Sequence, residues 1–233
     1  MPDGRNRTTA HAIRQPTLAL RDASFAHGDR NIVDRFNLSV EPGEHHLLIG
    51  RSGSGKSTLI NLVRGFLRPD SGTIRVSGEL ISDGSETARD AIRRAHLGVV
   101  FQSLRLVSAL SLENNLSLAA KLAGKPVAPS EVSSLLHDLG IAELSAKRPY
   151  QLSQGEAQRA AIARALIVKP ALLIADEPTS ALDQDNAEAV AEMFLRQAEQ
   201  HGTTLLIATH DTRLRAYFRN VVELESQNSE VVA

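Results

Sequence analysis

The sequence predicts an α/β fold in which a mostly parallel sheet is interrupted by a helical insert at about 103–158. Helix-like and strand-like segments alternate from residue 160 onward, a pattern typical of parallel sheets. Within the insert, Leu and Val recur at steps of three and four residues, which is helical spacing. The 233 residues are 42% hydrophobic and 23% charged, which supplies enough apolar material for the core of a soluble globular domain.

Short strands around one helix are expected in the first half of the chain. Segments 17–25 and 37–50 alternate or cluster apolar residues and stop at glycine or proline, which predicts strands joined by tight turns. Helical spacing follows over 56–66. Segments 72–78 and 97–101 are again typical of short strands.

The second half supplies the helical insert and the remaining strands. Helices are predicted within 111–126 and 129–140, and a glycine ends each of them. The pattern after residue 160 is then, in order, a helix, a strand at 171–176, a helix to 202, a strand at 203–209, a short helix and a strand at 220–225. We expect one domain over 17–225, with flexible tails at 1–16 and 226–233.

Composition excludes several kinds of site and partner. The chain contains no cysteine, so a disulfide framework and a thiolate metal site are both impossible. A net charge of -1 argues against nucleic acid as the main partner, because duplex binding needs a strong basic excess. No run of about 18 apolar residues and no segment of signal-peptide type occurs, so we expect that the chain itself does not cross a membrane.

A phosphate-binding motif follows the strand that ends at residue 50. The sequence matches G-x-x-x-x-G-K-[ST] at Gly50, Gly55, Lys56 and Ser57, between an apolar strand and an amphipathic helix. Backbone N–H groups of this loop can turn toward a β-phosphate, while Lys56 would reach the β- and γ-phosphates and Ser57 would ligate Mg²⁺. The residues expected to bind the nucleotide here are Gly50, Arg51, Ser52, Gly53, Ser54, Gly55, Lys56, Ser57 and Thr58.

Two acids follow the next apolar strand, at 171–176. Asp176 and Glu177 would lie at the carboxyl end of that strand, which is where ligands bind in open α/β sheets. We expect Asp176 to hold magnesium through water and Glu177 to polarise the water that attacks the γ-phosphate. Two acids after a strand can also cap a helix, but the phosphate loop upstream favours the catalytic interpretation.

Histidines occur at two places that invite a functional interpretation. His210 ends the strand at 203–209 and would share the sheet with Glu177, so it could bond the γ-phosphate or steady Glu177. His45 and His46 are neighbours on a strand and would point to opposite faces, which makes a shared metal ion difficult. We interpret that pair as structural.

These segments, in this order, resemble the motifs of the ATPase subunit of an ABC transporter. "GRSGSGKST" resembles the Walker A loop, Gln102 in "VVFQS" the Q-loop and "LSQGE" the signature; "LLIADE" resembles Walker B, Asp183 in "SALD" the D-loop and His210 the switch histidine. The resemblance spans about 17–225. It implies a P-loop NTPase core with a mostly parallel sheet, an N-terminal antiparallel β subdomain and an inserted α-helical subdomain.

The resemblance also implies how the chain works. The cofactors would be ATP and Mg²⁺, and Gln102 would contribute to catalysis and to metal coordination. Two copies would face each other head to tail, so that Ser153 and Gly155 of one copy hold the γ-phosphate bound to the other, beside Gln154, Glu156 and Asp183. Integral membrane permease subunits would be the other partners. They would hold the chain at the cytoplasmic face of the inner membrane.

The signature and the adenine contact depart from the family pattern. Gln154 replaces the first glycine of L-S-G-G-Q and Glu156 replaces its glutamine. We expect the Glu156 carboxylate to turn away from the phosphate, because it favours the helix dipole but repels an anion. His27 takes the place of the aromatic residue that usually stacks on adenine, which predicts weaker discrimination between bases.

The membrane partner is the least defined part of the resemblance. Four apolar residues follow Gln102, at the junction that receives a coupling helix in the family, although they could equally face the core. They are Leu104, Leu106, Val107 and Leu110. The short length and "LSQGE" look most like the lipoprotein-releasing and macrolide-export group, which acts on periplasmic substrates.

Two alternatives stay open at this point. The cassette could drive a membrane process other than transport, such as regulation of a cell-wall hydrolase. DNA-repair and translation members are disfavoured, because paired cassettes, zinc modules and coiled coils are not visible. A P-loop kinase would also use Lys56 and Asp176, but it would need neither the signature nor a dimer with shared sites.

Overall fold

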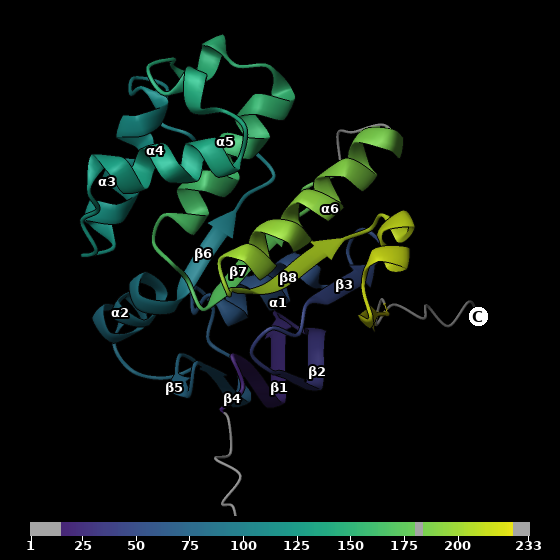
Figure 1. The fold of residues 1–233 in the computed structure, drawn as a ribbon. Coiled ribbons are helices and arrows are strands. Elements are labelled where there is room, and N and C mark those ends of the chain that lie inside the picture. Colours follow the sequence, from purple (N-terminus) through teal and green to yellow (C-terminus); the bar gives the residue numbers. More distant parts are fainter. Residues whose placement is uncertain (1–14, 180–183, 226–233) are drawn as a thin grey trace, which may run out of the picture.

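The computed structural model describes residues 15–179 and 184–225. A parallel sheet lies at the centre, a helical subdomain at one end and an antiparallel sheet at the other (Figure 1). Asp183 and the predicted tails, apart from residues 15 and 16, lie outside the described residues. None of the described helices is both long and apolar enough to span a bilayer.

The central sheet is parallel throughout, as the alternating pattern predicts. Its strand order is β6-β7-β8-β3-β9, and each neighbouring pair runs in the same direction. All of its strands therefore end at one edge of the sheet, where the site is built. The strands are β3 (His46–Gly50), β6 (Leu97–Val100), β7 (Leu172–Asp176), β8 (Thr204–Thr209) and β9 (Asn220–Leu224).

The second sheet is antiparallel, as the resemblance implies. Its order is β2-β1-β4-β5, with β1 (Leu18–His27), β2 (Arg30–Val40), β4 (Ser71–Val76) and β5 (Glu79–Leu80). β2 begins well before the strand expected from residue 37. The pairing of β1 with β2 shifts register near Leu20, Ala23 and Phe25, and these irregularities break the alternation on which a sequence prediction depends.

Six α-helices and three 3₁₀-helices occur in the described residues. The helix over Glu86–His96 (α2) was not predicted; it is rich in charged residues, and Ile92 is its only large apolar side chain. The other α-helices are α1 (Lys56–Val63), α3 (Leu112–Leu122), α4 (Pro129–Asp138), α5 (Gln154–Leu166) and α6 (Gln184–Gln200). The 3₁₀-helices are η1 (Ala142–Leu144), η2 (Pro149–Gln151) and η3 (Thr212–Tyr217).

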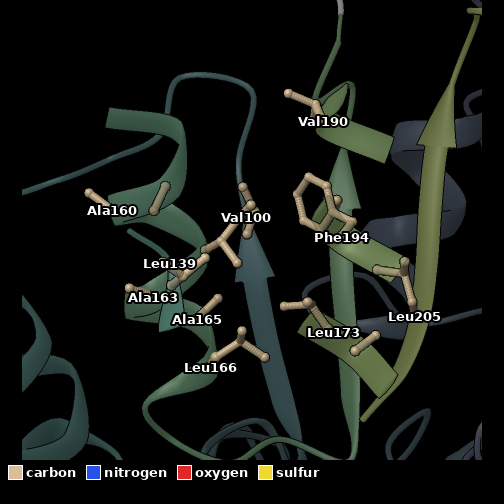
Figure 2. Close-up of a cluster of buried hydrophobic side chains, with 14 of the residues drawn as sticks. Val100, Leu139, Ala160, Ala163, Ala165, Leu166, Leu173, Val190, Phe194 and Leu205 are labelled. Carbon is tan, nitrogen blue, oxygen red and sulfur yellow. The ribbon is translucent and has the colours of Figure 1, made fainter. Parts of the chain in front are cut away.

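Each face of the parallel sheet is covered by its own core. Alternate strand residues, such as Leu173 and Leu205, pack with the helical subdomain and α6, where Phe194 is fully buried (Figure 2). Their neighbours in sequence, such as Leu172 and Leu206, pack with α1 and the antiparallel sheet on the other face. Burial on both faces explains why these strands read as continuous apolar runs.

Candidate active site

Loops from four neighbouring strands converge at the carboxyl edge of the parallel sheet. A cavity of about 580 Å³ opens there. β3 supplies the Walker A loop, β6 leads to Gln102, β7 to Glu177 and β8 to His210. The cavity is lined by Arg30, Ile32, Ser52, Gly53, Gly55, Lys56, Ser57, Thr58, Gln102, Glu177 and His210. The structure thus brings together four of the motifs that the sequence places far apart.

The Walker A loop has the backbone geometry of an anion site. Gly53 and Gly55 have φ angles of +80° and +97°, a left-handed conformation that favours glycine. Gly55 directly precedes α1, so the free N–H groups of the helix start face the cavity together with Ser57 and Thr58. These donors and the positive end of the helix dipole suit a phosphate group.

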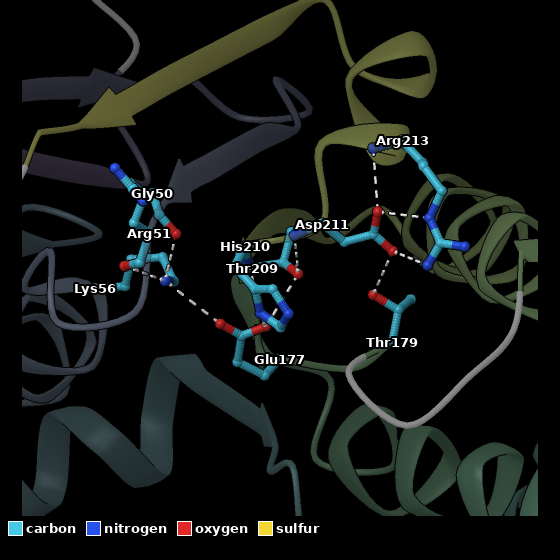
Figure 3. Close-up of polar contacts among 9 residues, drawn as sticks. All are labelled: Gly50, Arg51, Lys56, Glu177, Thr179, Thr209, His210, Asp211 and Arg213. Atoms are coloured by element: carbon cyan, nitrogen blue, oxygen red, sulfur yellow. Dashed lines mark hydrogen bonds and ion pairs between the residues drawn. The ribbon is translucent and has the colours of Figure 1, made fainter.

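Lys56 is held across this loop. Its Nζ donates to the carbonyl oxygen of Gly50 at 2.7 Å and to that of Arg51 at 3.2 Å (Figure 3). It also lies 3.4 Å from Oε1 of Glu177. The lysine side chain is only 6% exposed. Lys56 therefore places a cation within the Walker A loop, held by two carbonyl oxygens and one carboxylate.

Glu177 is fixed from several sides at the end of β7. Its φ angle of +50° is unfavourable for a residue with a side chain, and its N–H donates to the Ala208 carbonyl at 2.8 Å. Oε2 accepts from Thr209 Oγ1 at 3.0 Å and from the His210 N–H at 3.3 Å, and it lies 2.8 Å from His210 Nδ1 (Figure 3). The predicted proximity of His210 and Glu177 is therefore present.

The residues expected at the metal suit Mg²⁺. Burial, followed by the charge of Glu177, raises the pKa of Asp176 above its ordinary value, and Arg64 and Lys56 oppose this shift. Oδ1 of Asp176 is buried and accepts no hydrogen bond. An ionised oxygen without a partner is costly unless a cation or an ordered water meets it. Ser57 and Gln102 line the cavity and carry side-chain oxygens that Mg²⁺ can take as ligands, whereas Asp176 is not among the lining residues.

The signature segment lies elsewhere. Ser153 precedes α5 and, with Gln154 and Gly155, is exposed to solvent; none of residues 153–156 lines the cavity. Ser153 Oγ donates to Oε2 of Glu156 at 2.8 Å, and the Glu156 N–H donates back at 3.4 Å. Hydrogen bonds from Ser153 lower the pKa of Glu156. The carboxylate thus folds back onto the helix start.

The structure brings residues to the cavity that the sequence analysis missed. Arg30 and Ile32 line it, whereas His27 does not. His27 and Arg30 face each other across the hairpin of β1 and β2, so the two candidates lie on opposite strands of one turn. Which of these two residues lines the cavity depends on the register of the hairpin, and that register shifts several times. The adenine contact of His27 stays a prediction.

His45 and His46 have separate backbone partners. Nδ1 of His45 accepts from the Leu205 N–H at 3.2 Å, and Nδ1 of His46 lies 3.3 Å from the Glu44 carbonyl oxygen. Over 15–179 and 184–225, no group of three or more His, Asp or Glu side chains is arranged to hold a metal ion. The contacts agree with the structural interpretation of this pair.

The apolar residues after Gln102 divide between the core and the surface. Leu104 and Leu106 are partly buried and pack against the core of the helical subdomain, whereas Val107 is 44% exposed. Two of the four residues proposed for a partner contact therefore have a core-facing role.

Comparison with known proteins identifies the family. The family model described as ABC transporter matches residues 33–180. An uncharacterised ABC transporter ATP-binding protein of Mycobacterium tuberculosis is 38% identical over 218 residues, which cover 91% of this chain and 88% of that protein. The macrolide export ATP-binding/permease protein MacB of Rhodopseudomonas palustris is 40% identical over 214 residues, which cover 89% of this chain and 33% of MacB.

Solved structures agree with the predicted fold class. cbiO1 of Clostridium perfringens, part of the ABC transporter complex cbiONQ, has a TM-score of 0.83 at 29% identity, covering 91% of this chain and 86% of that one. The ATP-binding cassette MJ0796, in a dimeric post-hydrolysis state bound to ADP and Pi, has a TM-score of 0.77 at 27% identity. The match covers 90% of this chain and 96% of that one. The P-loop NTPase core with an antiparallel β subdomain is confirmed. This chain belongs to the ABC transporter family as an ATP-binding subunit, and its activity is ATP hydrolysis.

Proposed function

We propose that this chain powers separate membrane subunits through ATP-driven closure and opening of a head-to-tail dimer. One observation carries the proposal: residues 153–156, which the resemblance assigns to the γ-phosphate, do not line the cavity that contains the Walker A loop of the same chain. A second copy would bring these residues to the open side of the cavity. The dimeric cassette MJ0796, bound to ADP and Pi, supports this arrangement.

In the proposed ATP complex, the Walker A amides and Lys56 hold the phosphates. Ser57, Gln102 and Asp176 hold Mg²⁺, which neutralises phosphate charge when bound. Support comes from Lys56, because its Nζ lies beside the amides at the loop, and from the unpartnered Oδ1 of Asp176. When the phosphates bind, Lys56 exchanges its contact with Oε1 of Glu177 for them.

Glu177 and His210 would carry out hydrolysis. The oxygen of the attacking water bonds to the γ-phosphorus, and the bond from that phosphorus to the bridging oxygen of ADP breaks. The proton of the water passes to Glu177. His210, whose side chain is 55% exposed, can turn from Glu177 toward the γ-phosphate. Loss of the γ-phosphate removes the charge that joins the copies, so the dimer opens.

Closure would complete the site with donors from the second copy. The Ser153 hydroxyl and the Gly155 N–H lie at the start of α5, where an anion is favoured by the helix dipole. Gln154, Glu156 and Asp183 would line the same interface. Two such sites related by a two-fold axis form one self-complementary contact with ATP inside it.

A groove near Gln102 suits the proposed membrane partner. It has a volume of about 480 Å³ and lies between the core and the helical subdomain, with exposed Phe66 and Leu122 among its lining residues. Arg64 and Arg164 also line it; burial lowers the pKa of each, and neither makes an ion pair with the described residues. A permease segment with an apolar side chain and carboxylates fits this groove, and would hold the chain at the cytoplasmic face of the inner membrane.

ATP-dependent dimerisation tests the proposal. Glu177→Gln, which slows hydrolysis, should form a dimer with ATP and Mg²⁺ in size-exclusion chromatography with light scattering, and remain a monomer without ATP. Gly155→Trp in that background should bind ATP but stay monomeric. A Cβ at Gly155 would meet only Arg159 Nη1, at 3.8 Å, and the position is exposed, so the substitution creates no contact at Cβ that the free chain must relieve.

A matched control places the same bulk elsewhere. Ser134→Trp, at an exposed position of α4, should dimerise like the parent. A stable ATP dimer of the Gly155→Trp variant would contradict the shared site, as would a parent that binds ATP and never dimerises.

A further inference from the structure

We infer that Thr209 is a positioning residue for hydrolysis: it holds Oε2 of Glu177 and leaves Oε1 to accept the proton of the attacking water. This inference rests on the proposed role of Glu177. Neither the Walker motifs nor the switch histidine includes Thr209, which the sequence analysis treated only as the end of an apolar strand.

The strand register places the hydroxyl beside the carboxylate. In the parallel pairing of β7 and β8, Asp176 is opposite Ala208, so the next residues, Glu177 and Thr209, lie side by side where the two strands end. Thr209 Oγ1 lies 3.0 Å from Oε2 of Glu177. Thr209 is fully buried, and solvent cannot compete for this contact.

A second contact determines which group donates. The Asp211 N–H donates to Thr209 Oγ1 at 3.1 Å, and an ionised Glu177 can only accept. The hydroxyl hydrogen is therefore directed to Glu177. Asp211 is itself held by Arg213, whose Nε and Nη2 lie 2.7 Å and 2.6 Å from its two carboxylate oxygens (Figure 3). The hydroxyl is thus oriented from both sides.

Thr209 keeps its contact when the other side chains move. In the proposed ATP complex, Lys56 leaves Oε1 for the phosphates and His210 turns to the γ-phosphate. The contacts of Thr209 and of the His210 N–H with Oε2 do not depend on these movements, and Thr209 makes the shorter of the two. In the inferred arrangement the water proton passes to Oε1, while the water oxygen bonds to the γ-phosphorus and ADP leaves.

Paired substitutions test the hydroxyl. Thr209→Val keeps the shape and removes the donor, and Thr209→Ala and Thr209→Ser differ from each other by the hydroxyl alone. We expect Thr209→Val to lower kcat about 10-fold or more, the effect of losing one hydrogen bond to a charged group, with the KM for ATP within about twofold. Thr209→Ser should stay within about threefold of wild type in kcat, and Thr209→Ala should be about 10-fold below Thr209→Ser.

A double-mutant cycle separates positioning from general destabilisation. In single-turnover assays, Thr209→Val should have little further effect in a Glu177→Gln background, because the base that it positions is already lost. Equal kcat in Thr209→Val and wild type would overturn the inference, and so would an undiminished effect of Thr209→Val in the Glu177→Gln background. If Thr209→Val does not fold, equal rates for the Ala and Ser variants have the same meaning. A near-normal rate for Glu177→Gln alone would instead refute the proposed role of Glu177.

Discussion

Replacing Glu177 by Gln should slow hydrolysis and tighten ATP binding in one variant. The carboxylate would no longer accept the water proton, and loss of a positioned general base costs about 10²- to 10⁴-fold in kcat. The same substitution removes the ion pair that Lys56 must leave before it can bind the phosphates. An ordinary loss of function has no reason to improve affinity, so the combination is diagnostic.

The size of the second effect follows from the geometry of the pair. Unit charges 3.4 Å apart attract by about 5 kcal/mol at an effective dielectric constant of about 20. Desolvation of both groups offsets most of this attraction, and Lys56 keeps its bonds to the carbonyl oxygens of Gly50 and Arg51. If the ion pair contributes about 1 kcal/mol of net stabilisation to the ATP-free site, its removal lowers the Kd for ATP approximately fivefold.

Two assays measure these effects. Steady-state phosphate release gives kcat, and equilibrium titration with a fluorescent ATP analogue gives Kd at a protein concentration that keeps the chain monomeric. Glu113→Gln is a matched control, because it removes an exposed carboxylate of α3 away from the cavity, and it should change neither value. A Glu177→Gln variant that hydrolyses ATP at a near-normal rate, or that binds it more weakly than wild type, would refute the reasoning.

Two further predictions concern the metal ligand and the groove. Because burial raises the pKa of Asp176, its ionised form is penalised in the folded chain at neutral pH; Asp176→Asn should therefore raise Tm without Mg²⁺, by about 2 to 4 °C for each kcal/mol relieved. The gain should shrink as pH falls toward the unfolded pKa of about 3.9, and a lower Tm of the variant at pH 7.5 would count against the buried charge. Leu122→Asp replaces an apolar side chain of the groove, 64% exposed, with a carboxylate. The variant should reduce copurification of membrane subunits at least 10-fold, and ATP hydrolysis by the isolated chain should stay within about twofold of wild type. Undiminished copurification would exclude this groove as the docking site.

The central strands could be predicted because a strand that is buried on both faces must be apolar along its whole length. β7 and β8 are covered on both faces, so the apolar runs at 171–176 and 203–209 stand out against any background. α2 has no such signal, since it is rich in charged residues and Ile92 is its only large apolar side chain. The strand expected at 17–25 is present as β1, but the first part of β2 was missed, because the register shifts of this hairpin break the period of two.

Some residues of the cavity could be predicted from the sequence, but the orientation of their side chains could not. Residues that follow neighbouring parallel strands must meet at one edge, and that rule alone brings Lys56, Glu177 and His210 together. Which oxygen of Glu177 each neighbour touches depends on the pairing of β7 with β8, which a single sequence does not contain. Arg30 was missed because it reaches the cavity only through the hairpin turn.

Turnover per molecule as a function of concentration tests the central claim most directly. If each site needs Ser153 and Gly155 of a second copy, specific ATPase activity should rise in proportion to protein concentration at low protein levels, and the total rate with its square. Specific activity should fall toward zero where light scattering detects only monomers. Constant activity per molecule across that range, with wild-type chain and saturating ATP and Mg²⁺, would contradict the shared site.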